Sequence, residues 1–526
     1  MLDEKHKPTE QGFETFDVEA VNKAGRRQPL YAARKKVFPK RAEGNFRRFK
    51  WIVMAITLTI YYVTPWLKWD RGPYAPDQFV LINLEARRFY FAFIEIWPQE
   101  FYYVAGMLVM AGIGLFLITS TVGRAWCGYA CPQTVWVDLF LVVERAVEGD
   151  RNQRIKLDKA PWSADKLVRR VLKHGTWLLI AVSTGGAWIF YFADAHELLD
   201  QLIHFEAPMV AYGTIAVLTF TTYTFGGLMR EQVCTYMCPW PRIQAAMLDE
   251  YSLTVTYNEW RGDPRSKHAK KMAAEGKPVG DCVDCNACVA VCPMGIDIRD
   301  GQQLECITCA LCIDACDNVM DKIGKERGLI SYATLNDYNE NMALATGSDL
   351  AASHIVPANV RDRATGKLSD RVRHTNWRSI FRLRTLVYFL VWGGIGLGML
   401  TVLALRSSLD INVLHDRNPL YVQLGSGDVR NGYDVKILNM ANEPRRIELS
   451  LSGLPTGTMS LASDTGERPD GVTLDVEPDK VMPVRVYVTA DPAALDGSNV
   501  EFNFVARNIG GPEQVASKVK FHSPER

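Results

Sequence analysis

The sequence predicts a multidomain membrane protein with a five-span α-helical bundle, a cytoplasmic cysteine-rich module and a C-terminal extracytoplasmic all-β sandwich. Three observations predict this fold class. Five long blocks contain no Asp, Glu, Lys or Arg, all twelve cysteines precede residue 317, and strand-like alternation fills residues 406–526. The net charge of +1 gives no indication of a nucleic-acid partner.

The five uncharged blocks have the length of membrane-spanning helices. About 20 apolar residues cross a bilayer as a helix, and Trp and Tyr gather at several block ends, as interfacial anchors do. Buried core helices are the alternative, but five uncharged runs of this length argue against it. The first block is interpreted as an anchor because some 50 residues precede it and no small-residue cleavage site follows. The blocks are 51–67, 101–123, 175–193, 207–229 and 386–405.

The distribution of Lys and Arg predicts which side of the membrane each loop faces. Residues 22–50 carry eleven of them, 144–173 nine and 361–384 eight, whereas 68–100 carries four and 194–206 none. Basic loops stay in the cytoplasm, so we expect a cytoplasmic N-terminus and a periplasmic C-terminus. The expected domains are a basic cytoplasmic N-terminus (1–50), a four-span membrane region (51–239), a linker with the cysteine-rich module (240–330), a cytoplasmic connector (331–385), the fifth span (386–405) and the outer domain (406–526).

Eight cysteines form two runs of the same spacing. Each run has three cysteines two residues apart and a fourth after three more, at 282, 285, 288 and 292 and again at 306, 309, 312 and 316. All twelve cysteines fall in or beside predicted cytoplasmic segments, where disulfides do not persist, which favours metal ligands or redox thiols. A zinc site needs no second triplet of this kind.

The two runs resemble the bacterial ferredoxin that carries two [4Fe–4S] clusters, over roughly residues 280–320. In that fold three thiolates wrap one cluster and the fourth of the run reaches across to the other. The resemblance implies that Cys282, Cys285, Cys288 and Cys316 bind one cluster, and that Cys306, Cys309, Cys312 and Cys292 bind the second. Asp317 stands where the ferredoxin pattern has Pro. Clusters that only brace the fold are the alternative, but two clusters close together suit electron relay better.

The remaining four cysteines lie in a repeated motif, CGYACP at 127–132 and CTYMCP at 234–239. Each copy follows a span that runs from outside to inside, so both lie at the cytoplasmic face. Residues 51–132 and 175–239 look like a parallel repeat of a two-helix hairpin, whose symmetry would bring the two motifs together. The alternative is that these cysteines only pack as small apolar residues at the edge of the membrane. The matched tyrosines at 129 and 236 argue against it.

The Pro after each second cysteine predicts that a helix begins there, because Pro suits the first helical turn. Cys131 and Cys238 would then lie near helix N-caps, where the helix dipole stabilises a thiolate. Four converging thiolates at 127, 131, 234 and 238 could hold Cu(I), form a thiol–disulfide pair or hold another cluster, and the spacing does not choose among these. Interfacial anchoring is the simpler interpretation of nearby Trp126, Arg124, Arg230, Trp240 and Arg242.

Histidines give no sign of haem, because none of the five blocks contains one. His196 and His204 lie on the expected outer side and are interpreted as solvated polar residues. The outer region carries strand-like alternation at 433–440, 447–452, 472–476, 484–488 and 500–506, separated by turn signals, which predicts a β-sandwich. It contains no Cys and no catalytic constellation, so we expect a docking or spacer role.

Together these features resemble the FixG/CcoG family of cytochrome oxidase accessory proteins over nearly the whole chain. The resemblance implies a bacterial inner-membrane protein that helps to mature cbb-type haem–copper oxidase by reducing Cu(II) to Cu(I), an oxidoreductase of copper-reductase type. It also implies a cytoplasmic electron donor, and oxidase subunits or copper chaperones as partners. We expect electrons to pass through the ferredoxin clusters to Cys127, Cys131, Cys234 and Cys238, and copper to be reduced there.

Two other functions remain open at this stage. A quinol-linked electron conduit would resemble membrane polyferredoxins of nitrate and nitrous oxide respiration, which share the Cys-Pro motifs. A non-redox assembly scaffold would act through the outer β domain, with the clusters only sensing redox state or iron.

Overall fold

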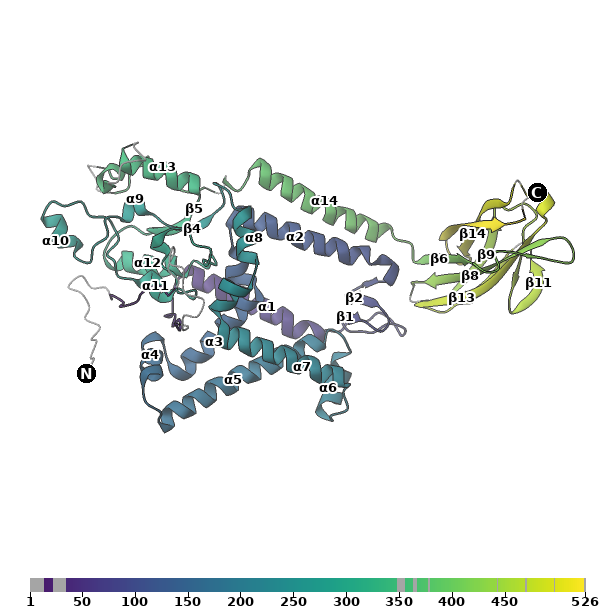
Figure 1. The fold of residues 1–526 in the computed structure, drawn as a ribbon, viewed down its shortest axis with the longest axis horizontal. Coiled ribbons are helices and arrows are strands. Elements are labelled where there is room, and N and C mark those ends of the chain that lie inside the picture. The colour runs from purple at the N-terminus through teal and green to yellow at the C-terminus, as the bar shows by residue number, and fades with distance from the viewer. Residues whose placement is uncertain are drawn as a thin grey trace. The chain divides into compact units, whose positions relative to one another are not determined.

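The computed structural model describes residues 14–21, 35–347, 355–362, 367–376, 379–441, 443–468, 471–495 and 497–524 (Figure 1). Parts of the basic N-terminal segment, residues 1–13 and 22–34, lie outside the described residues. The chain divides into two compact units, which are described separately. The first contains Met1–Leu67, Val80–Tyr90 and Glu95–Leu397, and the second contains Lys68–Phe79, Phe91–Ile94 and Gly398–Arg526.

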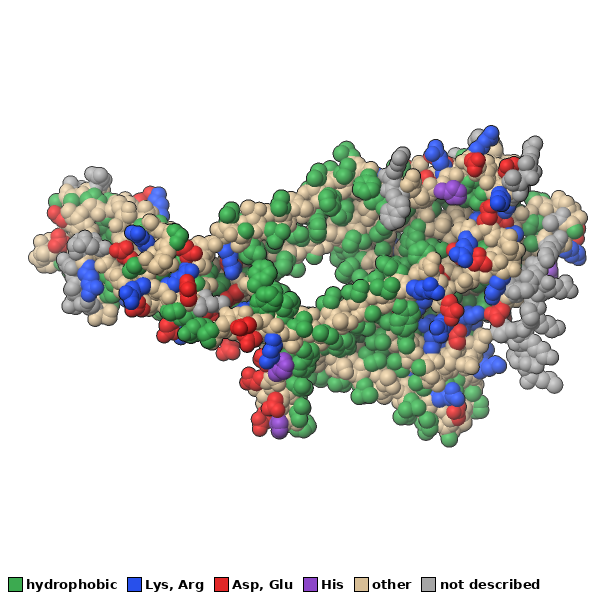
Figure 2. All heavy atoms as spheres, turned by 180° about the vertical axis from the view of Figure 1, so that it is seen from behind, with side chains coloured by type: hydrophobic (Ala, Val, Ile, Leu, Met, Phe, Trp, Pro, Cys, Tyr) green, Lys and Arg blue, Asp and Glu red, His purple; other side chains and the backbone are tan. Residues whose placement is uncertain are grey.

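Among the described residues, two helices are long and apolar enough to cross a membrane, judged by length and composition. They are Pro98–Val122, which contains helix α2 (Tyr102–Val122), and helix α14 (Leu383–Leu405). They coincide with the predicted blocks 101–123 and 386–405. Large apolar side chains such as Leu108 and Leu390 are exposed on their surfaces, and Figure 2 shows how hydrophobic side chains gather over the long helices. Water-exposed helices of this composition would be unstable, so a lipid environment suits both.

The other three predicted spans correspond to helices that are less uniformly apolar or less regular. Helix α1 (Asn45–Val63) begins with basic residues, and the first half of α5 (Ala164–Ile189) is charged. Helix α7 (Met209–Thr222) passes into a π-helical segment, η4 (Tyr223–Met229). These departures distinguish α1, α5 and α7 from α2 and α14, and the five-span arrangement stays a prediction.

The cysteine-rich region forms a small module around two short helices and a two-stranded sheet. Helix α11 (Ala287–Val291) and helix α12 (Leu311–Lys322) each begin inside one cysteine run. Strand β4 (Thr254–Tyr257) pairs antiparallel with strand β5 (Ile330–Ala333). The core of the module buries cysteines together with aliphatic side chains, among them Val289, Ile313 and Met320.

The segment expected to be a linker, 240–280, is more ordered than the sequence suggested. It contains helices α8 (Trp240–Met247), α9 (Glu259–Gly262) and α10 (Ala269–Ala274), as well as strand β4. In the connector, helix α13 (Leu335–Thr346) shares a second small core with Trp260 and Val360. Three further helices of the first unit are α3 (Pro132–Glu148), α4 (Arg151–Lys159) and α6 (Ala195–Ile203). The stretch before α2 forms a three-stranded sheet of β1 (Val80–Asn83), β2 (Arg88–Phe91) and β3 (Ile94–Ile96).

The C-terminal part of the second unit is a β-sandwich of two antiparallel sheets. One sheet has the order β11-β10-β13-β8-β6, with β7 also pairing with β8, and the other has the order β12-β9-β14-β15. The strands are β6 (Leu409–His415), β7 (Val422–Gln423), β8 (Val429–Asn439), β9 (Arg445–Ser452), β10 (Thr458–Leu461), β11 (Asp464–Arg468), β12 (Val472–Val476), β13 (Lys480–Ala490), β14 (Asn499–Asn508) and β15 (Gln514–His522). All five predicted strand patterns lie in strands, and the predicted sandwich is confirmed.

The sandwich core depends on a cluster of three aromatic rings. Tyr433 on β8 meets Phe504 on β14 edge-to-face at 5.2 Å between ring centroids, and Phe502 lies 5.3 Å from Phe504. All three are at most 1% exposed. Because β8 and β14 belong to different sheets, these contacts join the two sheets.

We expect Phe504→Ala to destabilise this domain by about 3–5 kcal/mol, because it leaves a cavity between the sheets. Hydrogen exchange in the full-length protein should then show faster exchange of the amides in β14. Val481→Ala removes a side chain that is 42% exposed and serves as the matched control. Equal protection of β14 in both variants would contradict the importance of the aromatic cluster.

Candidate functional site

The eight ferredoxin-type cysteines form two groups in space. Cys316 interacts electrostatically with Cys288, Cys282 and Cys285, although it belongs to the other run of the sequence. Cys292 likewise faces Cys309 and Cys306. We call the group of Cys306, Cys309, Cys312 and Cys292 the proximal group, and the group of Cys282, Cys285, Cys288 and Cys316 the distal group. This is the grouping that the crossed ligand assignment requires, and ligation itself stays a prediction.

The two cysteine loops share an unusual backbone conformation. The residues on either side of the middle cysteine have positive φ in both loops: 49° and 58° at Asp284 and Asn286, and 57° and 59° at Thr308 and Ala310. Left-handed backbone is costly for residues other than glycine, so its occurrence at matched positions marks loops shaped for a purpose. In cluster-binding loops such turns direct backbone N–H groups toward sulfur.

The residues present fit [4Fe–4S] clusters. The N–H of Ala287 bonds to the Cys285 sulfur, and the N–H of Thr308 bonds to that of Cys306. Burial raises the pKa of the Cys306 thiol to about 11 and that of Cys292 to about 12. Thiols buried together ionise readily only next to cationic metal, as iron provides in a cluster.

Two charged residues lie near the distal group: Arg299, which the sequence did not single out, and Asp317, which it marked as a departure from the ferredoxin pattern. Arg299 interacts with Cys288 and Cys282, and its guanidinium contacts Asp284 at 2.6 Å. Asp317 continues helix α12 where the ferredoxin pattern has Pro, and its carboxylate accepts the Gly328 N–H at 2.9 Å. Burial raises the pKa of Asp317. The departure from the ferredoxin pattern thus lengthens the helix and leaves the grouping of the cysteines unchanged.

The two Cys-Pro motifs converge, as the repeat predicted. Cys234 interacts electrostatically with Cys131, Cys127 and Cys238, and Cys127 interacts with Cys131 and Cys238. We call these four residues the membrane thiol site. Both motifs place residues in short π-helical segments, Trp126–Ala130 and Val233–Met237. The four thiols therefore come together as expected, while the repeat of the two-helix hairpin stays a prediction.

The two motifs begin their following helices differently. Cys131 is the N-cap of α3, and Pro132 is its first residue, as expected. Cys238 lies one residue before the N-cap of α8, which is Pro239. Burial raises the pKa of Cys127 and of Cys234 to about 12, so these two are neutral thiols without a bound cation. The Cys127 thiol donates to Oε1 of the buried Gln244 at 3.0 Å.

The first motif packs directly on the loop of the proximal group. A Cβ added to Gly128 would lie 2.7 Å from the Ile307 carbonyl oxygen and 3.0 Å from the Cys309 Cα. The Tyr129 hydroxyl donates to the Cys309 carbonyl at 3.1 Å. Cys127 and Cys234 both pack against the core of the ferredoxin module. The membrane thiol site and the proximal group are therefore in contact through backbone and side chains.

The symmetry of the two motifs ends at this contact. Tyr129 is 7% exposed, whereas its counterpart Tyr236 is 61% exposed. Met237 and Trp240 are exposed as well. The first motif faces the ferredoxin module, and the second leaves its aromatic and thioether side chains uncovered.

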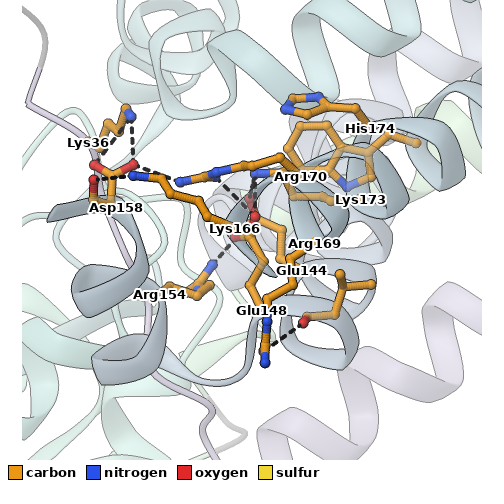
Figure 3. A network of polar contacts seen from close by, with 12 residues as sticks. Lys36, Glu144, Glu148, Arg154, Asp158, Lys166, Arg169, Arg170, Lys173 and His174 are labelled. Carbon is orange, nitrogen blue, oxygen red and sulfur yellow. Dashed lines mark hydrogen bonds and ion pairs between the residues drawn. The ribbon is translucent and has the colours of Figure 1, made fainter. Parts of the chain in front are cut away.

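A buried network of charges joins α3, α4 and α5 (Figure 3) and reaches Arg230, just before the second motif. Glu144 on α3 accepts from Arg154 at 2.5 Å and from Arg230, which precedes the second motif. Lys173 on α5 lies 3.0 Å from Glu148. Burial acts to raise the pKa of Glu144, but Arg230 and the other cations hold it below its usual value. Removing one partner from such a network leaves uncompensated buried charge, so the network fixes α3, α5 and the second motif together.

None of the described groups of His, Cys, Asp and Glu places three side chains close enough to hold a single metal ion. A [4Fe–4S] cubane is wider than one ion, so its ligands stand further apart. Gly128 and Gln244, which adjoin or contact the thiols, were not singled out from the sequence, and Arg124 was named there but interpreted as an interfacial anchor. Spacing within a motif carries no signal for such contacts, because their partners lie far away in the chain.

Comparisons with known proteins agree with this geometry. A family model described as a 4Fe-4S dicluster domain matches residues 229–335, and one described as a 4Fe-4S binding domain matches 104–147. A third, the IG-like fold at the C-terminal of FixG, matches 399–524. Iron–sulfur clusters and an oxidoreductase role in electron transfer follow from these matches.

Curated relatives match nearly the full chain. The chain is 64% identical to "Nitrogen fixation protein FixG" of Rhizobium meliloti (strain 1021), covering 97% of both chains. It is 48% identical to "Protein RdxA" of Cereibacter sphaeroides, covering 94% of this chain and 99% of the relative. "Protein RdxB" of the same organism is 53% identical, over 88% of this chain and 90% of the relative. The chain therefore belongs to the FixG family of 4Fe–4S proteins.

Proposed function

We propose that this protein reduces Cu(II) to Cu(I) for the maturation of a cbb-type haem–copper oxidase. Electrons come from a cytoplasmic donor, pass through the eight ferredoxin-type cysteines and the clusters they bind, and reach the membrane thiol site. The observation that carries the proposal is the packing of Gly128 and Tyr129 on the loop of Cys309. Electron tunnelling slows steeply with distance, and this contact makes the last step short.

The chemistry of the thiols suits copper as the substrate. Soft thiolate ligands favour Cu(I) over Cu(II), which helps to drive the reduction. In a direct route, each Cu(II) accepts one electron that arrives through the ferredoxin module, and no S–S bond forms. In a dithiol route, two thiols form one disulfide, release two protons to solvent and supply two electrons that reduce two Cu(II) to two Cu(I). Two further electrons and two protons then restore the thiols.

The proposal includes a topology and a set of partners. Five spans, with residues 406–526 in the periplasm of a bacterial inner membrane, put the membrane thiol site at the cytoplasmic face. The partners are then membrane lipids, a cytoplasmic electron donor, and oxidase subunits or copper chaperones. The uncovered side chains of Tyr236, Met237 and Trp240 support access of a partner or of lipid to the second motif.

A second candidate function is quinol-linked electron transfer. A cavity of about 260 Å³ lies beside Cys306, lined by the polar side chains of Arg124, Gln302 and Thr254 and by aliphatic groups such as Leu248 and Leu304. A mixed polar and aliphatic lining suits a small carbonyl-bearing ring next to a redox group. Oxidation of a short-chain quinol by the purified protein, with reduction of the clusters, would favour this function over copper reduction.

Cys131→Ser/Cys238→Ser should stop copper reduction and leave the ferredoxin clusters in place. The experiment mixes anaerobic, stoichiometrically reduced protein with Cu(II) and a Cu(I) indicator in a stopped-flow instrument. Wild type should show rapid cluster reoxidation matched by Cu(I), and the variant should stay reduced. Cu(I) formation at the wild-type rate in the variant would rule out the membrane thiol route.

Iron analysis tests whether the membrane thiol site holds another cluster, one of its three proposed contents. Two cubanes contain about eight irons per chain, and we expect about eight in both wild type and the double Ser variant. That result leaves copper binding or a thiol–disulfide pair at the site. About twelve irons in wild type, falling to about eight in the variant, would instead assign another cluster to it.

Gly128→Ala should slow electron transfer from the ferredoxin module to copper while the iron content stays at the wild-type level. The added methyl group meets the Ile307 carbonyl, and overpacking of this kind costs about 1–3 kcal/mol. Gly112→Ala, on α2, has open space around its Cβ and is the matched control. Equal stopped-flow rates for the two variants would show that this contact does not limit the transfer.

A further inference from the structure

Arg124 is a buried cation between the end of α2 and the first Cys-Pro motif. The chain turns at Gly123, which has φ of 61°, and a Cβ there would lie 2.5 Å from the Leu253 carbonyl oxygen. This turn requires glycine and directs the chain toward the ferredoxin module. Arg124 itself is 5% exposed. A guanidinium buried this deeply is retained only where its charge and donors are used.

The guanidinium of Arg124 joins three segments of the chain. One terminal nitrogen donates to the carbonyls of Leu304 and of Cys306, the latter at 3.1 Å. The other donates to the Pro241 carbonyl at 2.7 Å. Leu304 and Cys306 belong to the loop of the proximal group, and Pro241 lies just after the second motif. The side chain of Arg124, just before the first motif, therefore connects the ferredoxin module with the segment that follows the second motif.

The charge of Arg124 also lies between the two redox sites. It interacts electrostatically with Cys306 of the proximal group and with Cys127 of the membrane thiol site. Glu305 is the other anionic residue near it. A cation placed between two groups that carry negative charge stabilises the reduced, more negative form of each.

We propose that Arg124 is a positioning residue of the electron path, which fixes the proximal group against the membrane thiol site and raises the reduction potential of the proximal group. The inference rests on the proposed transfer of electrons between these two sites. It does not depend on copper being the final acceptor. Its two parts, geometry and charge, are separable, because Lys keeps the charge but lacks the planar fork that reaches three carbonyls.

The test is a redox titration of the full-length protein, followed by electron paramagnetic resonance, without copper. Arg124→Gln should shift the reduced–oxidised equilibrium of one cluster about tenfold toward the oxidised form, equivalent to about 59 mV for one electron. Arg299→Gln removes the cation beside the distal group and should shift the other cluster instead. Arg242→Gln, an exposed Arg on α8, should shift neither. Iron analysis of each variant shows whether the clusters assemble.

Wild-type potentials in Arg124→Gln, at full iron content, would overturn the proposal. If Arg124→Gln loses iron, the Arg124→Lys variant tests the role of the charge. Full iron content with the wild-type potential supports that role. Full iron content with a lowered potential contradicts it. Loss of iron from both variants, with Arg242→Gln intact, would also overturn the proposal, because Arg124 would then be an assembly residue. Failure of wild-type protein to reduce Cu(II) would refute the proposed function and leave these potentials interpretable.

Discussion

The arrangement of the redox sites depends on one close contact, that of Gly128 with the Ile307–Cys309 backbone. Any side chain at this position would separate the two surfaces, because the neighbouring atoms belong to backbone that cannot rotate away. The contact places Cys127 one residue from the ferredoxin loop, and Tyr129 secures it with a hydrogen bond to the Cys309 carbonyl. Since tunnelling requires short distances, the absence of a side chain at residue 128 supports the electron path that we propose.

A second contact of the same kind holds the ferredoxin module to helix α1. The first backbone N–H groups of α1, at Phe46 and Arg47, donate to the carboxylate of Asp314 at 3.2 and 2.7 Å. Asp314 lies on α12, so the ferredoxin module supplies the cap that Gly44 at the N-cap position of α1 does not. The module is thus fixed at two glycines, and the position of α12, which carries Cys312 and Cys316, is coupled to a predicted membrane helix.

Local patterns in the sequence predict the cysteine groups and the β-sandwich, whereas the surroundings of the thiols depend on contacts between residues far apart in the chain. Spacing identified both cysteine groups, and the repeat indicated that the Cys-Pro motifs converge. The alternation of apolar and polar residues identified five strands of the sandwich. Among the strands that it did not identify is β15, whose burial pattern is that of an exposed edge strand. Gln244 and Asp314 gave no signal, and Arg124 was interpreted only as an interfacial anchor, because each acts on a partner more than a hundred residues away. The π-helical segment after α7 was also hidden, since its glycines pack on Phe140 and Trp177 from other helices.

The unequal surroundings of the two motifs fit the relay that we propose. Cys127 and Cys234 both pack against the ferredoxin module, but the module buries only the tyrosine of the first motif. A relay with both surfaces covered in the same way would receive electrons and have no face from which to pass them on. In the proposed relay, burial of Tyr129 on the module gives the membrane thiol site a receiving side, and exposure of Tyr236 and Met237 gives it a free side. Under that proposal the departure from symmetry sets the direction of transfer, while the convergence of the two motifs supplies the four thiols.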